Sequence, residues 1–307
     1  NTMTGPSFDD RDGHIWFDGE MLDWRDARVH VLTHAMHYAS AVFEGERSYG
    51  GEIFKVQEHH ERLVGSGQML GFDVPYSVAE ITQAAYDVLK KNEIVNGYVR
   101  PIAWRGSEMM GVSAQETKIH LAIAAWPWPS YFSPEARLKG IRLKTARWRR
   151  PSPETAPVQS KAAGLYMICT LSKHEVEAEG FDDALMLDWR GQVAECTGAN
   201  IFLLQEGVLN TPTPDCFLDG ITRRTVMELA EKRGYKVVNR SIMPEEIGNS
   251  EEVFVTGTAA EVTPVSQIDN LNFKVGVVGQ QMMEDYDALV NRREPRLIEL
   301  PSEAAAE

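Results

Sequence analysis

The sequence predicts a two-domain protein of mixed α/β (α+β) class, and three observations support that class. At 307 residues the chain exceeds the usual size of one domain. The first half runs strands, two helices, strands, an order typical of an α+β module and not of a doubly wound sheet. A stretch rich in proline and aromatic residues, 126–140, then interrupts the pattern. We therefore expect a small N-terminal domain over 1–129, a linker over 130–140 and a larger C-terminal domain over 141–307.

The first domain opens with two hairpin signals. Apolar runs flank Asp18-Gly19, a dipeptide suited to a type I′ turn, and a second pair of runs turns at Gly50-Gly51. Apolar residues then recur at helical spacing over 56–72 and 77–94. Two further strands, over 96–106 and 118–128, are expected to complete the domain.

The second domain mixes strands and helices in turn. We expect a strand over 140–146, a helix from Leu165 to Glu179 and three short strands within 182–212. A helix beginning near Ile221 is stopped by Gly234 and followed by a strand. The segment 251–268 is predicted to be strand, tight turn, strand.

Composition excludes several classes of protein. The formal net charge of −14 argues against nucleic-acid binding, which depends on lysine and arginine neutralising phosphates, and the one basic cluster, "RLKTARWRRP", is compatible with a solvated face. No apolar run approaches the roughly 20 residues that span a bilayer. The acidic first 20 residues lack the features of a secretory signal, so a soluble cytoplasmic protein is expected. Three cysteines without CxxC spacing support neither a disulfide framework nor a zinc ribbon.

Metal and nucleotide motifs are not supported either. His34 and His37, and the pair His59-His60, have spacings that a metal can use, but no cysteine or carboxylate completes a ligand set. The stretch "GSGQMLG" fails the GxGxxG pattern at Leu70, and no Walker A sequence is present. We therefore expect no metal, dinucleotide or ATP site.

One lysine has unusual neighbours. In "VQSKAAGLYM", Lys161 is followed by Ala162, Ala163 and Gly164, which leave space around an amine, and then by an apolar helical run that contains Tyr166. A surface lysine ordinarily has polar company. This environment indicates an amine that faces something specific.

Three features could hold an anion. Gly220 precedes a helix whose first N–H groups, near Ile221 and Thr222, point outward at the positive end of the helix dipole. The Thr256–Ala260 turn exposes backbone donors without bulky side chains, and Arg62 offers a guanidinium fork. Taken singly, the turns are ordinary helix and strand features, and Arg62 is equally compatible with a salt bridge.

Glu195 is a carboxylate among Val193, Ala194 and Cys196, either exposed on a loop or buried with a cationic or donor partner. Pyridoxal 5′-phosphate explains these features together. It needs a lysine for the Schiff base, a carboxylate that keeps the ring nitrogen protonated and helix N-termini for its phosphate.

The whole chain resembles the class IV aminotransferases and, among them, the branched-chain amino acid aminotransferases. The resemblance rests on stretches in family order: "HVLTHAMHYASAVFEGERSY", "HHERL", "GYVRP", "KAAGLY", "ECTGANIF", "LDGITR" and "GTAAEVTPV". It implies the two-domain fold type IV with the cofactor at the domain interface, in a homodimer or dimer-based oligomer. The implied reaction moves the amino group between L-leucine, L-isoleucine or L-valine and 2-oxoglutarate.

The resemblance also implies roles for individual residues. Lys161 would carry the cofactor and shuttle a proton, Tyr166 would bond its phenolic oxygen and Glu195 its ring nitrogen. The remaining implied cofactor contacts are Arg62, Leu218, Ile221, Thr222 and Thr258. The implied substrate pocket comprises Tyr38, Phe43, Gly45, Arg47, Tyr98, Arg100, Trp128, Thr258, Ala259 and Ala260, with Val112 on a loop lent to the neighbouring subunit.

Three alternatives stay open. Relatives with the same cofactor site act on D-amino acids or (R)-amines or cleave aminodeoxychorismate, but the loop "RGSEMMGVSAQ" lacks the Arg-x-His pair typical of the D-specific branch. A phosphate-ligand binding protein without catalysis is the alternative from another class. For the aromatic residues, ordinary core packing competes with a pocket role. Glu46 and Glu108 depart from the family pattern, and these departures leave room for a broadened or shifted range of amino-acid substrates.

Overall fold

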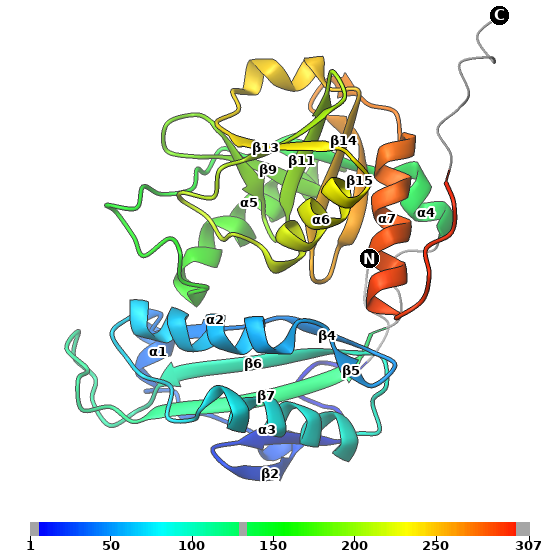
Figure 1. Cartoon of the computed structure of the whole chain (residues 1–307). Helices are drawn as coiled ribbons and strands as arrows, with labels where there is room; N and C mark the ends of the chain where they lie inside the picture. The colour runs from blue at the N-terminus through cyan, green and yellow to red at the C-terminus, as the bar shows by residue number, and fades with distance from the viewer. Residues whose placement is uncertain (1–5, 129–133, 299–307) are drawn as a thin grey trace, which may run out of the picture. The chain divides into compact units, whose positions relative to one another are not determined.

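The computed structural model describes residues 6–128 and 134–298 (Figure 1). The chain divides into two compact units, which are described separately below. Unit 1 contains the described residues up to 128 together with 159–165, and unit 2 contains 134–158 and 166–298. Helices and strands mix in both units, as the predicted α+β class requires.

Unit 1 is built on a seven-stranded antiparallel sheet in the order β2-β1-β7-β6-β4-β5, with β3 also paired to β6. Helices α2 and α3 lie side by side along the sheet (Figure 1). The strands are β1 (His14–Phe17), β2 (Glu20–Asp23), β3 (Ala41–Phe43), β4 (Glu46–Tyr49), β5 (Glu52–Ile53), β6 (Gly97–Arg105) and β7 (Ile119–Pro127). The helices are η1 (Trp24–Asp26), α1 (His34–Tyr38), α2 (Val56–Met69) and α3 (Val78–Lys91).

Both predicted hairpins form, and local chemistry explains why. The φ angle is positive at Asp18 (48°) and Gly19 (95°), as a type I′ turn between β1 and β2 requires. The turn between β4 and β5 has positive φ at Gly50 and Gly51. Helix α3 begins with a capping box between Ser77 and Glu80 and buries its apolar face in the core of unit 1.

Unit 2 is built on a nine-stranded mixed sheet in the order β10-β9-β8-β15-β14-β11-β12-β13, with β16 paired to β15. Strand β8 runs parallel to β9 and β15, and β12 parallel to β13. The strands are β8 (Ile141–Thr145), β9 (Asp183–Leu187), β10 (Val193–Cys196), β11 (Asn200–Gln205), β12 (Val208–Pro212), β13 (Lys236–Arg240), β14 (Glu252–Gly257), β15 (Glu261–Ile268) and β16 (Leu271–Asn272). The helices are α4 (Pro134–Lys139), η2 (Ala163–Tyr166), α5 (Met167–Ala178), α6 (Ile221–Lys232), η3 (Pro244–Asn249) and α7 (Val277–Val290), η2 beginning within unit 1.

The structure differs from the sequence predictions in several places. The segment 182–212 contains four strands, β9 to β12, where three were expected. The predicted linker contains helix α4, while residues 130–133 lie outside the described residues. Helix α5 begins two residues later than predicted, after the 3-10 turn η2. The segment 159–165 belongs to unit 1, although the chain order assigned it to the second domain. Helix α7 was not predicted from the sequence.

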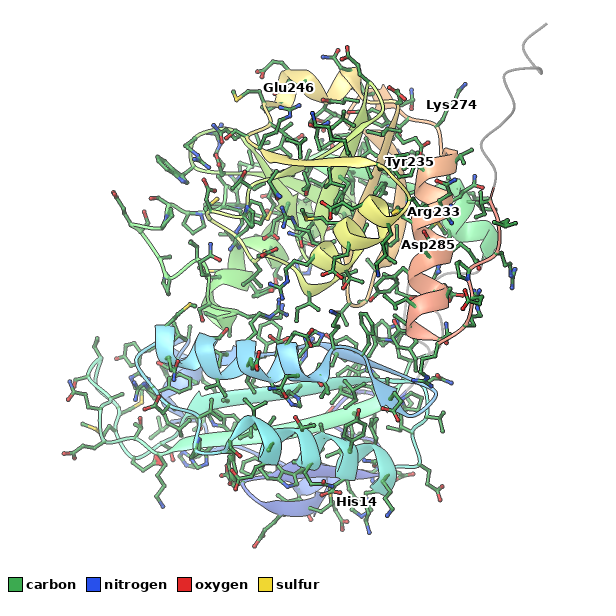
Figure 2. The ribbon with its side chains drawn as sticks, in the orientation of Figure 1. His14, Arg233, Tyr235, Glu246, Lys274 and Asp285 are labelled. Atoms are coloured by element: carbon green, nitrogen blue, oxygen red, sulfur yellow. The ribbon has the colours of Figure 1, made fainter. Side chains whose placement is uncertain are left out.

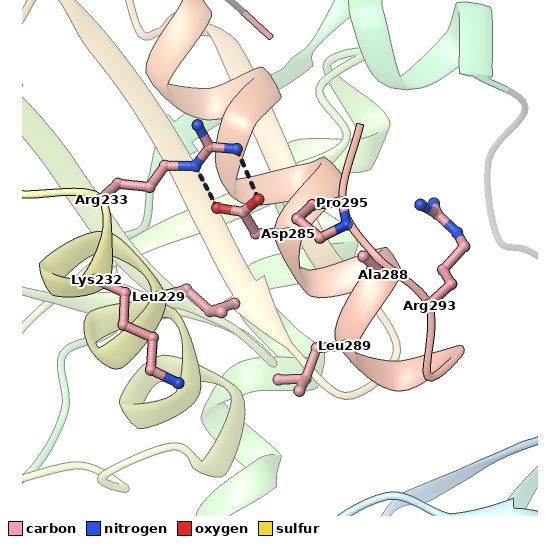
Figure 3. A pocket seen from close by; sticks show the side chains of 8 residues that line it. All are labelled: Leu229, Lys232, Arg233, Asp285, Ala288, Leu289, Arg293 and Pro295. Carbon is pink, nitrogen blue, oxygen red and sulfur yellow. Dashed lines mark hydrogen bonds and ion pairs between the residues drawn. The ribbon is translucent and has the colours of Figure 1, made fainter. Parts of the chain in front are cut away.

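Helices α6 and α7 are joined by a partly buried ion pair in unit 2. Arg233 and Asp285 point toward one another, with Arg233 Nη2 2.7 Å from Asp285 Oδ1 (Figure 2). A hollow of about 310 Å³ lies beside this pair (Figure 3). It is lined by Leu229, Lys232, Arg233, Asp285, Ala288, Leu289, Arg293 and Pro295. None of the predicted site residues lines it.

In the described part of the chain, every helix is too short or too polar to cross a lipid bilayer.

Candidate active site

Lys161 is held by backbone contacts on two sides within unit 1. Ala162 forms an antiparallel bridge with Val42, and the Phe43 N–H donates to the Lys161 carbonyl oxygen at 3.2 Å. The Lys161 N–H donates to Ser66 Oγ at 2.9 Å, which ties the segment to helix α2. Residues 161 and 162 therefore pair alongside β3. These backbone contacts fix the position from which the Lys161 side chain extends.

The Lys161 amine lies among aromatic and cationic groups. Its Nζ is 4.8 Å from the centre of the Phe43 ring. Burial, with help from the nearby Arg62 guanidinium, lowers the pKa of Lys161 to about 8, while the Glu44 carboxylate acts in the opposite direction. A larger fraction of this amine is neutral, and so nucleophilic, near pH 7 than of an ordinary lysine amine.

Arg62 makes a two-point ion pair. Its Nε donates to Glu44 Oε1 at 2.6 Å and its Nη2 to Glu44 Oε2 at 2.8 Å. His59 Nδ1 approaches the same Oε2 at 2.7 Å. The salt bridge that the sequence left open as the alternative for Arg62 therefore exists, and the pair places a guanidinium in the same unit as Lys161.

Several of the predicted substrate residues of unit 1 gather around Tyr98. The Arg100 guanidinium lies 4.7 Å from the centre of the Phe43 ring and donates through Nη2 to the Tyr98 hydroxyl at 2.8 Å. The Trp128 ring lies 5.4 Å from the Tyr98 ring. A Cβ at position 45 would collide with the Tyr98 hydroxyl, so only glycine fits there.

An apolar hollow of about 400 Å³ in unit 1 has Arg100 in its wall. Its other lining residues are Ile15, Phe17, Ala27, Val29, Thr33, Ala35, Met36, Ala41, Ile102, Trp104, Ala122 and Ala124. The hollow combines apolar walls with a single cationic side chain. Of the predicted substrate residues, Arg100 alone is in this lining, so the hollow differs from the pocket that the sequence predicts.

Tyr38 and Val112 are exposed, at 43% and 81% of their surface. His34 contacts Tyr38 and the residue that precedes Val112. The His34 ring stacks on Tyr38 at 4.7 Å, and its Nε2 lies 2.9 Å from the carbonyl oxygen of Gly111, next to Val112. The predicted loop residue is therefore presented outward by a defined contact.

The two departures from the family pattern make contacts within unit 1. Glu46 is fully buried, with His60 Nε2 3.0 Å from its Oε1, so it faces helix α2. Its neighbour Arg47 points to the other face of β4, because side chains alternate along a strand. Glu108 turns back on its own loop and accepts from the Lys118 N–H at 3.2 Å.

In unit 2, Glu195 has a cationic partner. It lies on β10, and Arg150 Nε is 3.5 Å from its Oε1. Arg150 is only 4% exposed, and its backbone N–H donates to the Leu187 carbonyl oxygen at 2.8 Å. The basic stretch around Arg150, interpreted from the sequence as a solvated face, thus contributes a buried guanidinium. An adjacent guanidinium favours the ionised form of a carboxylate.

The two turns of unit 2 that were predicted to bind an anion are linked through Asn200. Its backbone pairs with Thr256 between β11 and β14, and its Nδ2 donates to the Leu218 carbonyl oxygen at 3.2 Å. A Cβ at Gly220 would collide with Asn200 Oδ1. Asn200 therefore brings the loop before helix α6 close to the end of β14.

Both turns offer backbone donors. Helix α6 has 12 residues and begins at Ile221, with Gly220 at the N-cap position and no side-chain cap. The first N–H groups of a helix have no acceptor within the helix, so those of Ile221 and Thr222 can bind an anion. Gly257 lies where a Cβ would be 2.9 Å from the Gly198 carbonyl oxygen, and the turn continues through Thr258, Ala259 and Ala260.

These residues are chemically suited to pyridoxal 5′-phosphate. Unit 1 contains an amine of lowered pKa and a guanidinium, and unit 2 contains an uncapped helix N-terminus, a glycine turn and a carboxylate paired to arginine. Tyr166 lies at the start of helix α5, where η2 ends. The described donors and acceptors thus include each type of group that the phosphate, the aldehyde and the ring nitrogen require.

The sequence did not reveal which side chains contact the candidate site residues. Glu44 and His59 hold Arg62, Arg150 pairs with Glu195, and Asn200 joins the two turns. Only Glu44 had a visible signal, because it is a charged residue that directly follows the apolar residues 41–43. The other contacts join distant parts of the chain, so spacing alone does not reveal them.

Known proteins share this fold over most of the chain. The family model of the class IV amino-transferases matches residues 41–268. The chain belongs to the class IV aminotransferases. This confirms the family expected from the sequence, and with it an enzyme that transfers amino groups.

Individual class IV aminotransferases are similar over nearly their full length. A branched-chain-amino-acid aminotransferase of Pseudomonas aeruginosa is 40% identical over 93% of this chain and 95% of its own. A probable branched-chain-amino-acid aminotransferase of Rickettsia felis is 42% identical over 90% and 96%.

Solved structures of such enzymes match equally well. The branched-chain amino acid aminotransferase of T.th. with pyridoxamine 5′-phosphate matches with a TM-score of 0.90 and 36% identity, over 93% of this chain and 96% of its own. Other structures under the same protein name contain N-(5′-phosphopyridoxyl)-L-glutamate and 4-methylvaleric acid. These matches confirm the predicted fold type IV.

Proposed function

We propose that this aminotransferase moves the amino group between L-leucine, L-isoleucine or L-valine and 2-oxoglutarate, giving branched-chain 2-oxo acids and L-glutamate. The observation that carries the proposal is the cluster of Lys161, Phe43, Tyr98 and Arg100, which joins an amine to an apolar wall with one cation. The names of the similar proteins support the same substrates.

Pyridoxal 5′-phosphate is the cofactor, in agreement with the pyridoxamine and phosphopyridoxyl compounds of the solved relative. When bound, it supplies an aldehyde that accepts the amino group and a ring that accepts electrons. Lys161 is the residue that holds it covalently and moves a proton at Nζ. Glu195 keeps the ring nitrogen protonated and Tyr166 binds the phenolic oxygen. The phosphate ligands are Arg62, Thr222 and Thr258 with the backbone of Leu218 and Ile221.

The substrate pocket must accept an apolar side chain in one half-reaction and a carboxylate in the other. Phe43, Tyr98 and Trp128 form the apolar wall, and Arg100 binds the distal carboxylate of glutamate. Backbone N–H groups of Ala259 and Ala260, with Thr258, bind the α-carboxylate. The other pocket positions are Tyr38, Gly45 and Arg47.

The proposed assembly is a homodimer or a dimer-based oligomer. Unit 1 exposes apolar side chains close together in sequence, including Val31 (64%) and Met36 (62%), beside Tyr38. Val112, which is strongly exposed, extends from the loop held by His34. A second copy of the chain would bury these side chains, and Val112 would enter the neighbour's pocket.

An absorbance spectrum tests the function directly. We expect the purified protein to show the band of lysine-bound pyridoxal phosphate near the visible edge, and L-leucine to shift it while D-alanine does not. Lys161→Ala should lack this band and turnover, whereas Lys91→Ala, on the surface of α3, should keep both.

Other outcomes would contradict parts of the proposal. A shift with D-alanine alone would move the substrate to the D-amino acids, and a shift with an (R)-amine but not L-leucine would move it to amines. No band after addition of pyridoxal phosphate would refute the cofactor assignment.

A further inference from the structure

Glu44 is a fully buried carboxylate with three donors. It accepts from Arg62 Nε and Nη2 at 2.6 and 2.8 Å and from His59 Nδ1 at 2.7 Å. Its side chain is 0% exposed, that of His59 is 2% and that of Arg62 is 20%. A buried carboxylate is stable only with such partners, so this arrangement has one well-defined geometry.

The protonation states follow from the contacts. Burial by itself would raise the pKa of Glu44, but the charge and hydrogen bonds of Arg62, with the hydrogen bond from His59, outweigh it and hold the pKa well below its usual value. Glu44 is therefore ionised at neutral pH and can only accept. His59 Nδ1 must carry the proton it donates.

A two-point contact fixes more than a one-point contact. The guanidinium is planar, so bonding through both Nε and Nη2 sets its plane and its rotation about the side chain at once. Arg62 without this partner would have several rotamers, and ordering them on ligand binding costs conformational entropy. Glu44 therefore fixes the orientation of the Arg62 guanidinium before a ligand binds.

We propose that Glu44, oriented by His59, is a positioning residue that holds the Arg62 guanidinium in the one geometry in which it receives the cofactor's phosphate. This inference rests on the proposed function, because it takes Arg62 as a phosphate ligand. Glu44 acts through Arg62, to which both of its carboxylate oxygens are bonded.

The chain contains a matched control two residues away. Glu46 is as deeply buried as Glu44 and also faces a histidine of helix α2, with His60 Nε2 at 3.0 Å. Glu46 lies against His60, whereas Glu44 is bonded both to His59 and to Arg62. Glu44→Gln and Glu46→Gln thus each replace a fully buried carboxyl group by an amide, one bonded directly to the phosphate arginine and one facing His60.

The experiment compares two probes on the apo-protein at equilibrium, pyridoxal 5′-phosphate and pyridoxal without phosphate. We expect Glu44→Gln to reduce the preference for the phosphorylated probe by about 10- to 100-fold, as loss of a charge-assisted contact predicts. A change in the reactivity of the Lys161 amine acts on both probes and cancels in this ratio. Glu46→Gln should keep the wild-type preference. A merely structural role would weaken both probes alike, so the ratio separates positioning from stability.

Two histidine variants keep the inference testable if Glu44→Gln does not fold. His59→Asn retains a donor near the Nδ1 position and should keep the preference, whereas His59→Leu should reduce it. An unchanged preference in both Glu44→Gln and His59→Leu would overturn the inference. A wild-type protein without any preference for the phosphorylated probe would instead refute Arg62's place in the proposed function.

The apo-protein offers an independent readout at Lys161. The Glu44 carboxylate raises the pKa of this amine, so its removal should move the amine's titration below the value of about 8. Chemical labelling of Lys161 as a function of pH measures the shift. A midpoint that stays in place or rises would contradict the electrostatic link between Glu44, Arg62 and Lys161.

Discussion

Lys161 is the residue where the environment changes chemistry most directly. Its backbone is tied to Phe43 and Ser66, and its amine lies over an aromatic ring near Arg62. Burial and the neighbouring positive charge both favour the neutral amine, so the pKa falls to about 8. The fold thereby prepares a nucleophile before any ligand binds.

This environment predicts the pH dependence of labelling in the wild-type apo-protein. Because only the neutral amine reacts, we expect the acylation rate of Lys161 to rise with pH around a midpoint of about 8, below the ordinary lysine value of about 10.4. Competitive labelling followed by mass spectrometry measures it, with a model amine as reference. A midpoint near that of the model amine would show that burial does not act as described.

The lowered pKa also affects stability. Between pH 8 and about 10.5 the unfolded chain binds more protons at Lys161 than the folded chain does. The contribution of this lysine to the free energy of unfolding of the apo-protein therefore rises with pH across that window. Lys161→Met, which cannot titrate, should lose this part of the rise in denaturant titrations, and an identical pH profile in both proteins would argue against it.

Glu195 and Arg150 form the second residue-scale feature. We expect Glu195→Gln to lower kcat with L-leucine by about two orders of magnitude or more, because an amide cannot keep a ring nitrogen protonated. Steady-state kinetics check this, with the exposed Glu251→Gln as the control. Wild-type kcat in Glu195→Gln would place the carboxylate elsewhere.

At the scale of elements, helix α1 controls the loop that follows β6. His34 Nε2 donates to the Gly111 carbonyl oxygen at 2.9 Å, and its Nδ1 lies 2.9 Å from Ser40 Oγ. The His34 backbone N–H also donates to the Gly106 carbonyl oxygen at 2.9 Å. One residue thus anchors both ends of the turn that presents Val112.

His34→Ala should loosen that turn without unfolding unit 1. We expect amide hydrogen exchange over 106–113 to become faster and KM for L-leucine to increase several-fold, since the side-chain hydrogen bond to the Gly111 carbonyl oxygen is lost while the backbone bond to Gly106 remains. His37→Ala, on the same helix but bonded to the Val31 carbonyl oxygen, is the control. Unchanged exchange over 106–113 in His34→Ala would rule out the anchoring role.

Elements with strong local signals were predictable from sequence. The Asp18-Gly19 turn and the capping box of α3 formed because their chemistry is local. Helix α5 starts later than its apolar pattern suggests because the preceding residues of Gln159–Leu165 follow unit 1. That choice depends on Val42 and Ser66, which lie about a hundred residues earlier, and no local pattern records it.

At the scale of the whole molecule, the exposed apolar side chains of unit 1 bear on assembly. We expect Val112→Asp to weaken the proposed dimer and to reduce activity in parallel, because a charge would be buried at the contact. Analytical ultracentrifugation and kinetics on the same samples measure both. Val95→Asp, also an exposed valine of unit 1, is the matched control. An active monomeric Val112→Asp would show that the site is complete in one chain.

The sequence by itself determined the family, the fold class and the types of group that the chemistry needs, because lysine, glycine turns and helix starts leave local marks in the chain. Only the tertiary structure decided which side chains hold those groups: Glu44 and His59 on Arg62, Arg150 on Glu195, and Asn200 between two turns. These partners come from other strands and helices. Their pairing is set by the burial of charge, which requires a partner in space and is indifferent to distance along the chain.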